Sequence, residues 1–109
     1  MKIAITSTGA SIDSPIDERF GRARYILVYD IQNGECEALD NETNLNLAQG
    51  AGIQTASMVA EKGVSVVLTG RVGPKADQAL KAANIKFIEN VSGTCRGVIE
   101  KYKSENAVI

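Results

Sequence analysis

The second half of the sequence alternates between helical and extended segments, and this alternation leaves few architectures open to the chain. Apolar residues recur at helical spacing in some segments, while β-branched residues cluster in the short runs between them. The predicted order is helix 50–63, strand 64–69, helix 73–84, strand 85–89 and helix 95–102. Strands joined through helices form right-handed parallel crossovers, so this half predicts an α/β sheet.

The first half adds strands of a different orientation. Residues 2–8 and 25–31 have the composition of buried strands, and residues 35–39 return after Asn33-Gly34. An Asn-Gly pair favours a type I′ turn, with positive φ at both residues, and hence an antiparallel hairpin. We therefore expect a three-layer α/β/α fold with a mixed five-stranded sheet in the order 3-2-1-4-5, strand 2 antiparallel, and three helices over both faces.

Each predicted helix carries an apolar stripe that identifies its buried face. The first stripe falls on one face of a helix, and the second and third follow the i, i+3, i+4, i+7 spacing of a helix packed on one side. The stripes comprise Ile53, Ala56, Val59 and Ala60 in the first helix, Ala76, Ala79, Leu80 and Ala83 in the second, and Cys95, Val98, Ile99 and Tyr102 in the third.

Length and composition indicate one ordinary globular domain spanning residues 1–109. The 109 residues are 44% hydrophobic and 23% charged, with a net charge of −1, and no run approaches the ~18 apolar residues of a spanning helix. The charge argues against a nucleic-acid or membrane partner. We expect a cytoplasmic, monomeric protein with reduced thiols at Cys36 and Cys95.

Four loops are expected to meet at one edge of the sheet. The carboxyl ends of the parallel strands share that edge, and ligands of open α/β sheets bind along it. The loops are residues 6–24, 40–52, 70–75 and 90–96, and the last three each run through glycine into a helix N-terminus. Unpaired N–H groups and the helix dipole at three such termini favour an anion.

Basic residues fall in the same loops, which supports an anionic ligand. They are Arg19, Arg22, Arg71, Lys75 and Arg96. The predicted binding residues are Arg19, Phe20, Gly21, Arg22, Gly50, Gly52, Gly70, Arg71, Gly73 and Thr94. The competing interpretation is that glycines and charges occupy ordinary surface loops.

The two cysteines are candidates for both metal binding and core packing. Cys95 lies near a helix N-terminus beside Arg96, where a thiolate is stabilised and can bind a soft metal. It also lies on the apolar stripe of its helix, and buried free cysteine is common, so a core position is the preferred interpretation. Cys36 is expected to be structural.

Catalytic motifs find little support in the sequence. No histidine is present, which excludes a Ser-His-Asp or Cys-His arrangement. Asp13, Asp17 and Glu18 offer carboxylates for a metal-dependent nuclease, but the first strand carries none of the carboxylates that two-metal chemistry needs. Residues 70–74 match neither a Walker A loop nor a dinucleotide-binding fingerprint. We therefore predict no catalysis.

Three motifs in register resemble one known family. The segments Asp17-Glu18-Arg19-Phe20-Gly21-Arg22-Ala23, Gly50-Ala51-Gly52-Ile53-Gln54 and Thr69-Gly70-Arg71-Val72-Gly73-Pro74-Lys75-Ala76 resemble the dinitrogenase iron-molybdenum cofactor-binding family, which includes NifX-like carriers and the C-terminal domain of NifB-like proteins. The resemblance spans nearly the whole chain. It departs from the family at Arg19, where relatives often have histidine.

The resemblance implies a ribonuclease H-like fold and a non-catalytic role in metal-cofactor assembly. Its expected cargo is an iron-molybdenum or other metal–sulfur cluster, or a precursor, held non-covalently or labilely, with cofactor-assembly proteins as partners. Arg19 excludes metal ligation by an imidazole at that position, and we expect its guanidinium to pair electrostatically with a cluster or another anion instead. Two alternatives stay open: an interaction or regulatory domain of the same fold that has lost its cargo, and a metal-dependent phosphoesterase or nuclease.

Overall fold

A five-stranded mixed sheet forms the centre of the computed structural model, which describes residues 1–106. The strands are β1 (Lys2–Ser7), β2 (Tyr25–Asp30), β3 (Cys36–Asp40), β4 (Val64–Leu68) and β5 (Lys86–Ile88). Their order is β3-β2-β1-β4-β5, with β2 antiparallel to both its neighbours and β4 parallel to β1 and β5. The predicted fold class, strand order and orientation are confirmed.

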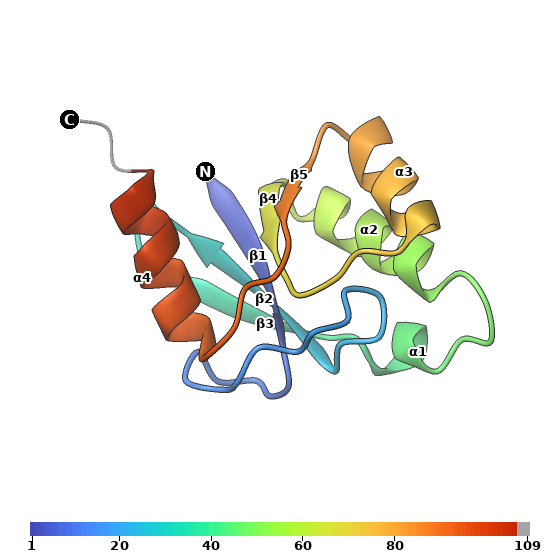
Figure 1. Ribbon diagram of the computed structural model, residues 1–109, viewed down its shortest axis with the longest axis horizontal. Coiled ribbons are helices and arrows are strands. Elements are labelled where there is room, and N and C mark those ends of the chain that lie inside the picture. Colours follow the sequence, from blue (N-terminus) through green and yellow to red (C-terminus); the bar gives the residue numbers. More distant parts are fainter. Residues whose placement is uncertain (107–109) are drawn as a thin grey trace.

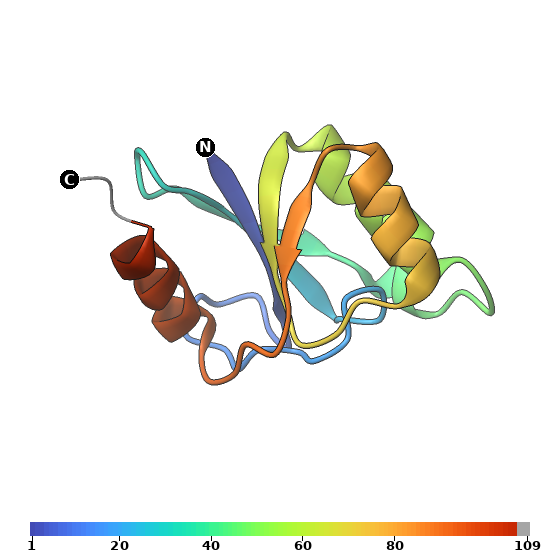
Figure 2. The ribbon, with the colours of Figure 1, turned by 45° about the horizontal axis from the view of Figure 1, so that its top comes forward.

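Helices cover both faces of the sheet. The helices are α1 (Glu42–Leu45), α2 (Ala51–Glu61), α3 (Pro74–Ala82) and α4 (Cys95–Glu105). Figures 1 and 2 show α2 and α3 on one side and α4 on the other. Side chains of β1 alternate between the two layers: Ala4 packs with α2 and α3, whereas Ile3 and Ile5 pack with α4. No helix in residues 1–106 has the length and apolar character needed to cross a membrane.

Two local predictions are wrong, and each has a physical reason. The structure has four helices where three were expected, because the single turn α1 buries no residue and so leaves no apolar pattern in the sequence. The β2–β3 hairpin is present, but only Gly34 has positive φ (77°), so its turn is not type I′. The Gly34 N–H donates to the Asp30 carbonyl over 2.8 Å, which closes a wider loop.

The buried face of α2 is also rotated from the prediction. Ile53 is 41% exposed and Ala60 is exposed, while Thr55 is buried beside Ala56 and Val59. Thr55 can be buried because its hydroxyl has hydrogen-bond partners in the interior, and a prediction from apolar residues alone omits such a position. The predicted stripe of α4 is confirmed at Cys95, Val98 and Ile99, with Tyr102 packed against the same cluster. In α3, Ala76 and Leu80 are buried as predicted, whereas Ala83 is exposed.

The ends of the described chain lie on one side of the molecule. β1 starts at the edge opposite to the carboxyl ends of the parallel strands, and α4 begins at the carboxyl edge and runs back from it (Figure 1). Eleven residues carry α4 about 16 Å in that direction. The long connections therefore gather at one edge, and the start of β1 and the end of α4 lie near the other.

Leu80→Ala tests the layer that supports α3. Leu80 is fully buried among side chains of α2 and the sheet, so we expect a loss of about 2–5 kcal/mol in the free energy of unfolding, measured by urea denaturation. Gln78→Ala, at an exposed position of the same helix, is the control and changes it by less than about 0.5 kcal/mol. Equal losses in the two variants contradict the packing described.

Candidate anion-binding cleft

A cleft of about 490 Å³ opens at the carboxyl edge of the sheet, beside α2 and α3. It is lined by residues 19–22, 50–53, 71 and 73–76. Segments that are far apart in the sequence thus form one surface: the loop before β2, the first turn of α2, and the loop that enters α3. This volume lies in the range of small-ligand sites.

Backbone contacts hold the first loop against the loop that follows β4. The Arg71 N–H donates to the Glu18 carbonyl over 2.7 Å, and the Phe20 N–H donates to the Arg71 carbonyl over 3.1 Å. A Cβ added to Gly70 meets the Glu18 carbonyl oxygen at 2.6 Å, so only glycine permits this approach. The pairing places Arg19 and Arg71 side by side.

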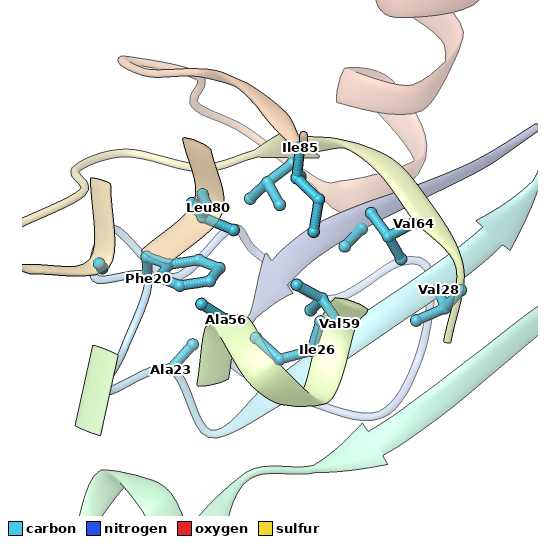
Figure 3. Close-up of a cluster of buried hydrophobic side chains, with 12 residues drawn as sticks. Phe20, Ala23, Ile26, Val28, Ala56, Val59, Val64, Leu80 and Ile85 are labelled. Atoms are coloured by element: carbon cyan, nitrogen blue, oxygen red, sulfur yellow. The ribbon is translucent and has the colours of Figure 1, made fainter. Parts of the chain in front are cut away.

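Phe20 anchors the same loop from below. Its ring is 1% exposed and lies in the cluster that contains Leu80 of α3 and Ala56 of α2 (Figure 3). The sequence predicted Phe20 as a binding residue. The structure places it under the cleft, where its burial fixes the position of Arg19 and Gly21 on either side of it.

A contact between small residues brings the two helix N-termini together. A Cβ added to Gly21 lies 2.6 Å from the Gly52 Cα, and one added to Gly52 lies 2.9 Å from the Ala76 Cβ. Real Cβ atoms do not approach this closely, so both positions need glycine. Gly21, Gly52 and Ala76, which we call the small-residue contact, join the first loop to α2 and α2 to α3.

Buried polar side chains hold the loop from its other side. Asn41 is 1% exposed, and its amide group donates to the carbonyls of Gly21 (3.3 Å) and Ala23 (2.9 Å). The Thr55 hydroxyl lies within 3.2 Å of both the Gly21 carbonyl and the Asn41 side-chain oxygen. Buried polar groups that are fully paired fix one conformation, so these two side chains specify the position of Gly21. Neither residue was predicted, because the sequence gives no sign that they meet.

The cleft carries positive charge without a carboxylate in its lining. Its lining residues include Arg19, Arg22, Arg71 and Lys75 and no acidic residue. Arg19 lies 3.5 Å from Asp17, which neutralises part of its charge. The described residues provide no ion-pair partner within 4 Å for the other three cations. A protein with a net charge of −1 therefore has a cationic surface at this point.

Arg22 is held in place by backbone oxygens. Its guanidinium group donates to the carbonyl of Leu45 (2.6 Å), the last residue of α1, and to that of Leu47 (3.0 Å), just after the helix. Carbonyl groups orient the side chain and leave its charge uncompensated, since neither carries a formal charge. The positive potential of Arg22 thus remains available to a ligand.

Both helices that reach the cleft start without a side-chain cap. The N-caps of α2 and α3 are Gly50 and Gly73, and neither helix has a cap hydrogen bond from a side chain. The first N–H groups of a helix have no partner within the helix, and the dipole adds about half a positive charge there. Two helix N-termini and four cations thus face one cleft.

The third predicted helix terminus, that of α4, does not join them. The N–H groups of Cys95 and Arg96 donate to carbonyls of the first loop over 2.9 and 2.7 Å, and the Gly97 N–H donates to the Thr94 hydroxyl over 3.1 Å. Arg96 is also paired with Asp13 at 2.6 Å, which raises the pKa of its guanidinium and lowers the pKa of Asp13. The first turn of α4 is thereby occupied by the protein itself.

Eight of the ten predicted binding residues line the cleft. The two others are Gly70 and Thr94. Gly70 lies in a neighbouring depression of about 560 Å³, which shares Arg19 and Arg71 with the cleft. Thr94 caps α4 on the other face of the sheet. The sequence missed Ile53, whose position in the first turn of α2 beside two predicted glycines was a usable signal.

The cysteines lie apart from the cleft. Cys95 is fully buried in the apolar cluster under α4, and burial is the main cause that raises the pKa of its thiol. Cys36 is exposed at the start of β3, the end away from the carboxyl edge. Among residues 1–106, no group of three or more His, Cys, Asp or Glu side chains is placed to hold a metal ion. The cleft suits contact with an anion through N–H groups and cations, and protein thiolates do not reach it.

Comparisons with known proteins identify a family and similar structures. The family model described as dinitrogenase iron-molybdenum cofactor matches residues 1–105. The apo form of the orange protein from Desulfovibrio gigas superposes with a TM-score of 0.92 at 41% identity, covering 95% of this chain and 88% of that one. A putative NifB protein from Thermotoga gives a TM-score of 0.83 at 32% identity over 96% and 88% of the two chains.

A further relative is known from sequence. An uncharacterised protein of Methanocaldococcus jannaschii is 30% identical over 89 residues, which are 78% of this chain and 75% of that protein.

The small-residue contact predicts a large effect for one glycine-to-alanine change in the cleft and almost none for another. Gly21→Ala forces a Cβ into the backbone of α2, so we expect it to lower the free energy of unfolding by roughly 1–3 kcal/mol. Gly73→Ala is the control, because a Cβ at Gly73 meets no atom within 4 Å, and we expect a change under about 0.5 kcal/mol. Similar effects of the two changes in urea denaturation argue against the contact.

Thiol labelling tests the positions of the cysteines. With iodoacetamide at pH 8, we expect Cys36 to be modified at least roughly tenfold faster than Cys95, as measured by mass spectrometry of peptides. Desolvation raises the pKa of both thiols, so less thiolate is present at neutral pH and labelling accelerates as the pH rises. Equal rates in the folded protein conflict with a buried Cys95.

Proposed function

We propose that this chain, which belongs to the dinitrogenase iron-molybdenum cofactor family, is a non-catalytic binding or carrier domain for an anionic metal–sulfur cluster or its precursor. The observation that carries the proposal is the cleft with four cations, two uncapped helix N-termini and no lining carboxylate. Iron– and molybdenum–sulfur species with net negative charge match this surface, because N–H groups and guanidinium groups donate hydrogen bonds to sulfide or oxide ligands.

The lining also favours a cargo with polarisable, weakly hydrated surfaces. Ile53, Pro74 and Ala76 present apolar groups beside the cations, and Ile53 is 41% exposed. A strongly hydrated anion loses hydrogen bonds to water on such a surface, and the apolar groups do not replace them. Sulfide ligands are more weakly hydrated, so a sulfur-rich anion loses less hydration free energy. Mixed apolar and cationic contacts therefore favour a sulfur-rich anion.

Holding the cargo without a protein ligand suits a carrier. The cleft is open to solvent and receives no thiolate, so loading and release require no exchange of a covalent metal–protein bond. We propose cofactor-assembly proteins as the partners that deliver and receive the cargo, with the domain acting as a cytoplasmic monomer. The putative NifB protein of Thermotoga, 32% identical, supports a role in this setting.

Anaerobic reconstitution tests the proposal directly. The protein is incubated with iron, sulfide and molybdate, passed through a desalting column, and examined by visible absorption and metal analysis. We expect metal and sulfide to elute with the protein, also in Cys36→Ser and Cys95→Ala variants, because the cations of the cleft hold the cargo. Absence of any uptake favours the cargo-free interaction domain, and uptake lost on Cys36→Ser indicates thiolate ligation instead.

Arg71→Ala distinguishes binding in the cleft from non-specific attraction of an anion to positive charge on the protein. Removing a hydrogen-bonding charge from the lining is expected to weaken retention of the reconstituted cargo roughly tenfold, and added salt to weaken it further. Lys86→Ala is the matched control: it removes one positive charge from an exposed residue at the start of β5, at the opposite edge of the sheet. Equal retention in the two variants and the unaltered protein refutes the cleft as the site.

A further inference from the structure

Gly73 is a glycine that its own backbone does not require. Its φ and ψ are −72° and 166°, an extended conformation that any residue adopts, and a Cβ there meets no heavy atom within 4 Å. Gly50, the corresponding N-cap of α2, differs because its φ of 81° demands glycine. Packing and conformation therefore explain Gly50 and leave Gly73 unexplained.

The conformation of Gly73 is one that a capping side chain would use. Thr94, the N-cap of α4, has φ −92° and ψ 156°, and its hydroxyl accepts a hydrogen bond from the Gly97 N–H. Ser, Thr, Asp and Asn are the preferred residues at such positions because they satisfy a free N–H group. Two helices of the same chain thus start from similar backbone, one with a cap and one without.

A cap at position 73 would occupy the donors of the cleft. A capping oxygen accepts from the N–H of the second or third helical residue, which in α3 are Lys75 and Ala76, and both line the cleft. Asp77 in the first turn does not take this role, because its carboxylate pairs with Lys81 at 3.0 Å. The missing side chain leaves these N–H groups free at a surface that four cations make positive.

We infer that Gly73 is a specificity-determining position of the cleft, which reserves the N–H groups of α3 for an anionic acceptor on the ligand. This inference deepens the proposed function and rests on the same cleft. The selected class is a compact anion with several acceptor atoms that completes the first turn of α3 in place of a protein side chain. A sulfide-bearing cluster matches both these donors and the apolar lining, whereas an oxyanion such as molybdate matches the donors alone and so serves as the probe for them. A neutral or cationic molecule gains nothing from these donors.

Gly73→Ser is expected to change stability and binding in opposite directions. A serine hydroxyl caps α3, so the melting temperature should rise by roughly 1–3 °C. The affinity for molybdate, measured by calorimetry, should fall about tenfold, because the anion must displace the cap. Gly73→Ala adds a Cβ without an acceptor, so it should lower the affinity for molybdate clearly less than Gly73→Ser does. Ala82→Ser adds a hydroxyl at the far end of α3 and should change neither quantity.

The outcomes separate this inference from the proposed function. Unchanged molybdate binding in Gly73→Ser overturns the inference, because it shows that the ligand does not use the N–H groups of α3. Equal losses of affinity in the serine and alanine variants also overturn it, because they show that the added side chain acts through its volume alone. If the unaltered protein binds molybdate with this dependence on Gly73 but takes up no cluster, the inference stands and the cluster-carrier proposal fails. If it binds neither, both fail.

Discussion

The close contact of Gly21 with Gly52, and of Gly52 with Ala76, is the constraint on which the site depends. It allows a loop and two helix N-termini to occupy a space that any larger side chain would block. The arrangement has an electrostatic cost, because two positive dipole ends and four cations repel one another when no anion lies between them. Burial of Phe20 and the hydrogen bonds of Asn41 act against that repulsion, because they fix the position of the first loop.

The fold was predictable because its signals are local and repeated. The alternation of strands and helices after Gly50 sets the parallel half of the sheet, and the hairpin around Gly34 sets the antiparallel half. Features without a local, repeated pattern were missed. α1 is one turn without a buried residue, and Thr55 is a buried polar residue whose partners are 14 and 34 positions away. Long-range pairing of this kind leaves no pattern within a window of sequence.

The location of the site at one edge of the sheet was predictable from the sequence, whereas the contacts that form it were less so. The topology argument placed four loops at one rim, and residues of three of them line the cleft. It failed for α4, because it counted every helix N-terminus as open, whereas loop carbonyls and Thr94 occupy that one. Whether a terminus is free depends on what packs against it, which spacing alone does not reveal. The prediction treated Gly21, Gly50 and Gly73 alike as binding residues. The structure distinguishes them, because Gly21 is closely packed, Gly50 has a positive φ, and Gly73 has open space around it.

The start of β1 and the end of α4 lie on the same side of the molecule, and this has a practical consequence for fusions to the domain. β1 starts and α4 finishes at the side away from the cleft, with the sheet between them and its mouth (Figures 1 and 2). A tether attached before β1 or after α4 therefore leaves the entrance clear, and a protein fused to this domain can face the mouth through a flexible linker. Such a fusion turns an encounter between two molecules into one within a single chain, at millimolar effective concentration for a short linker.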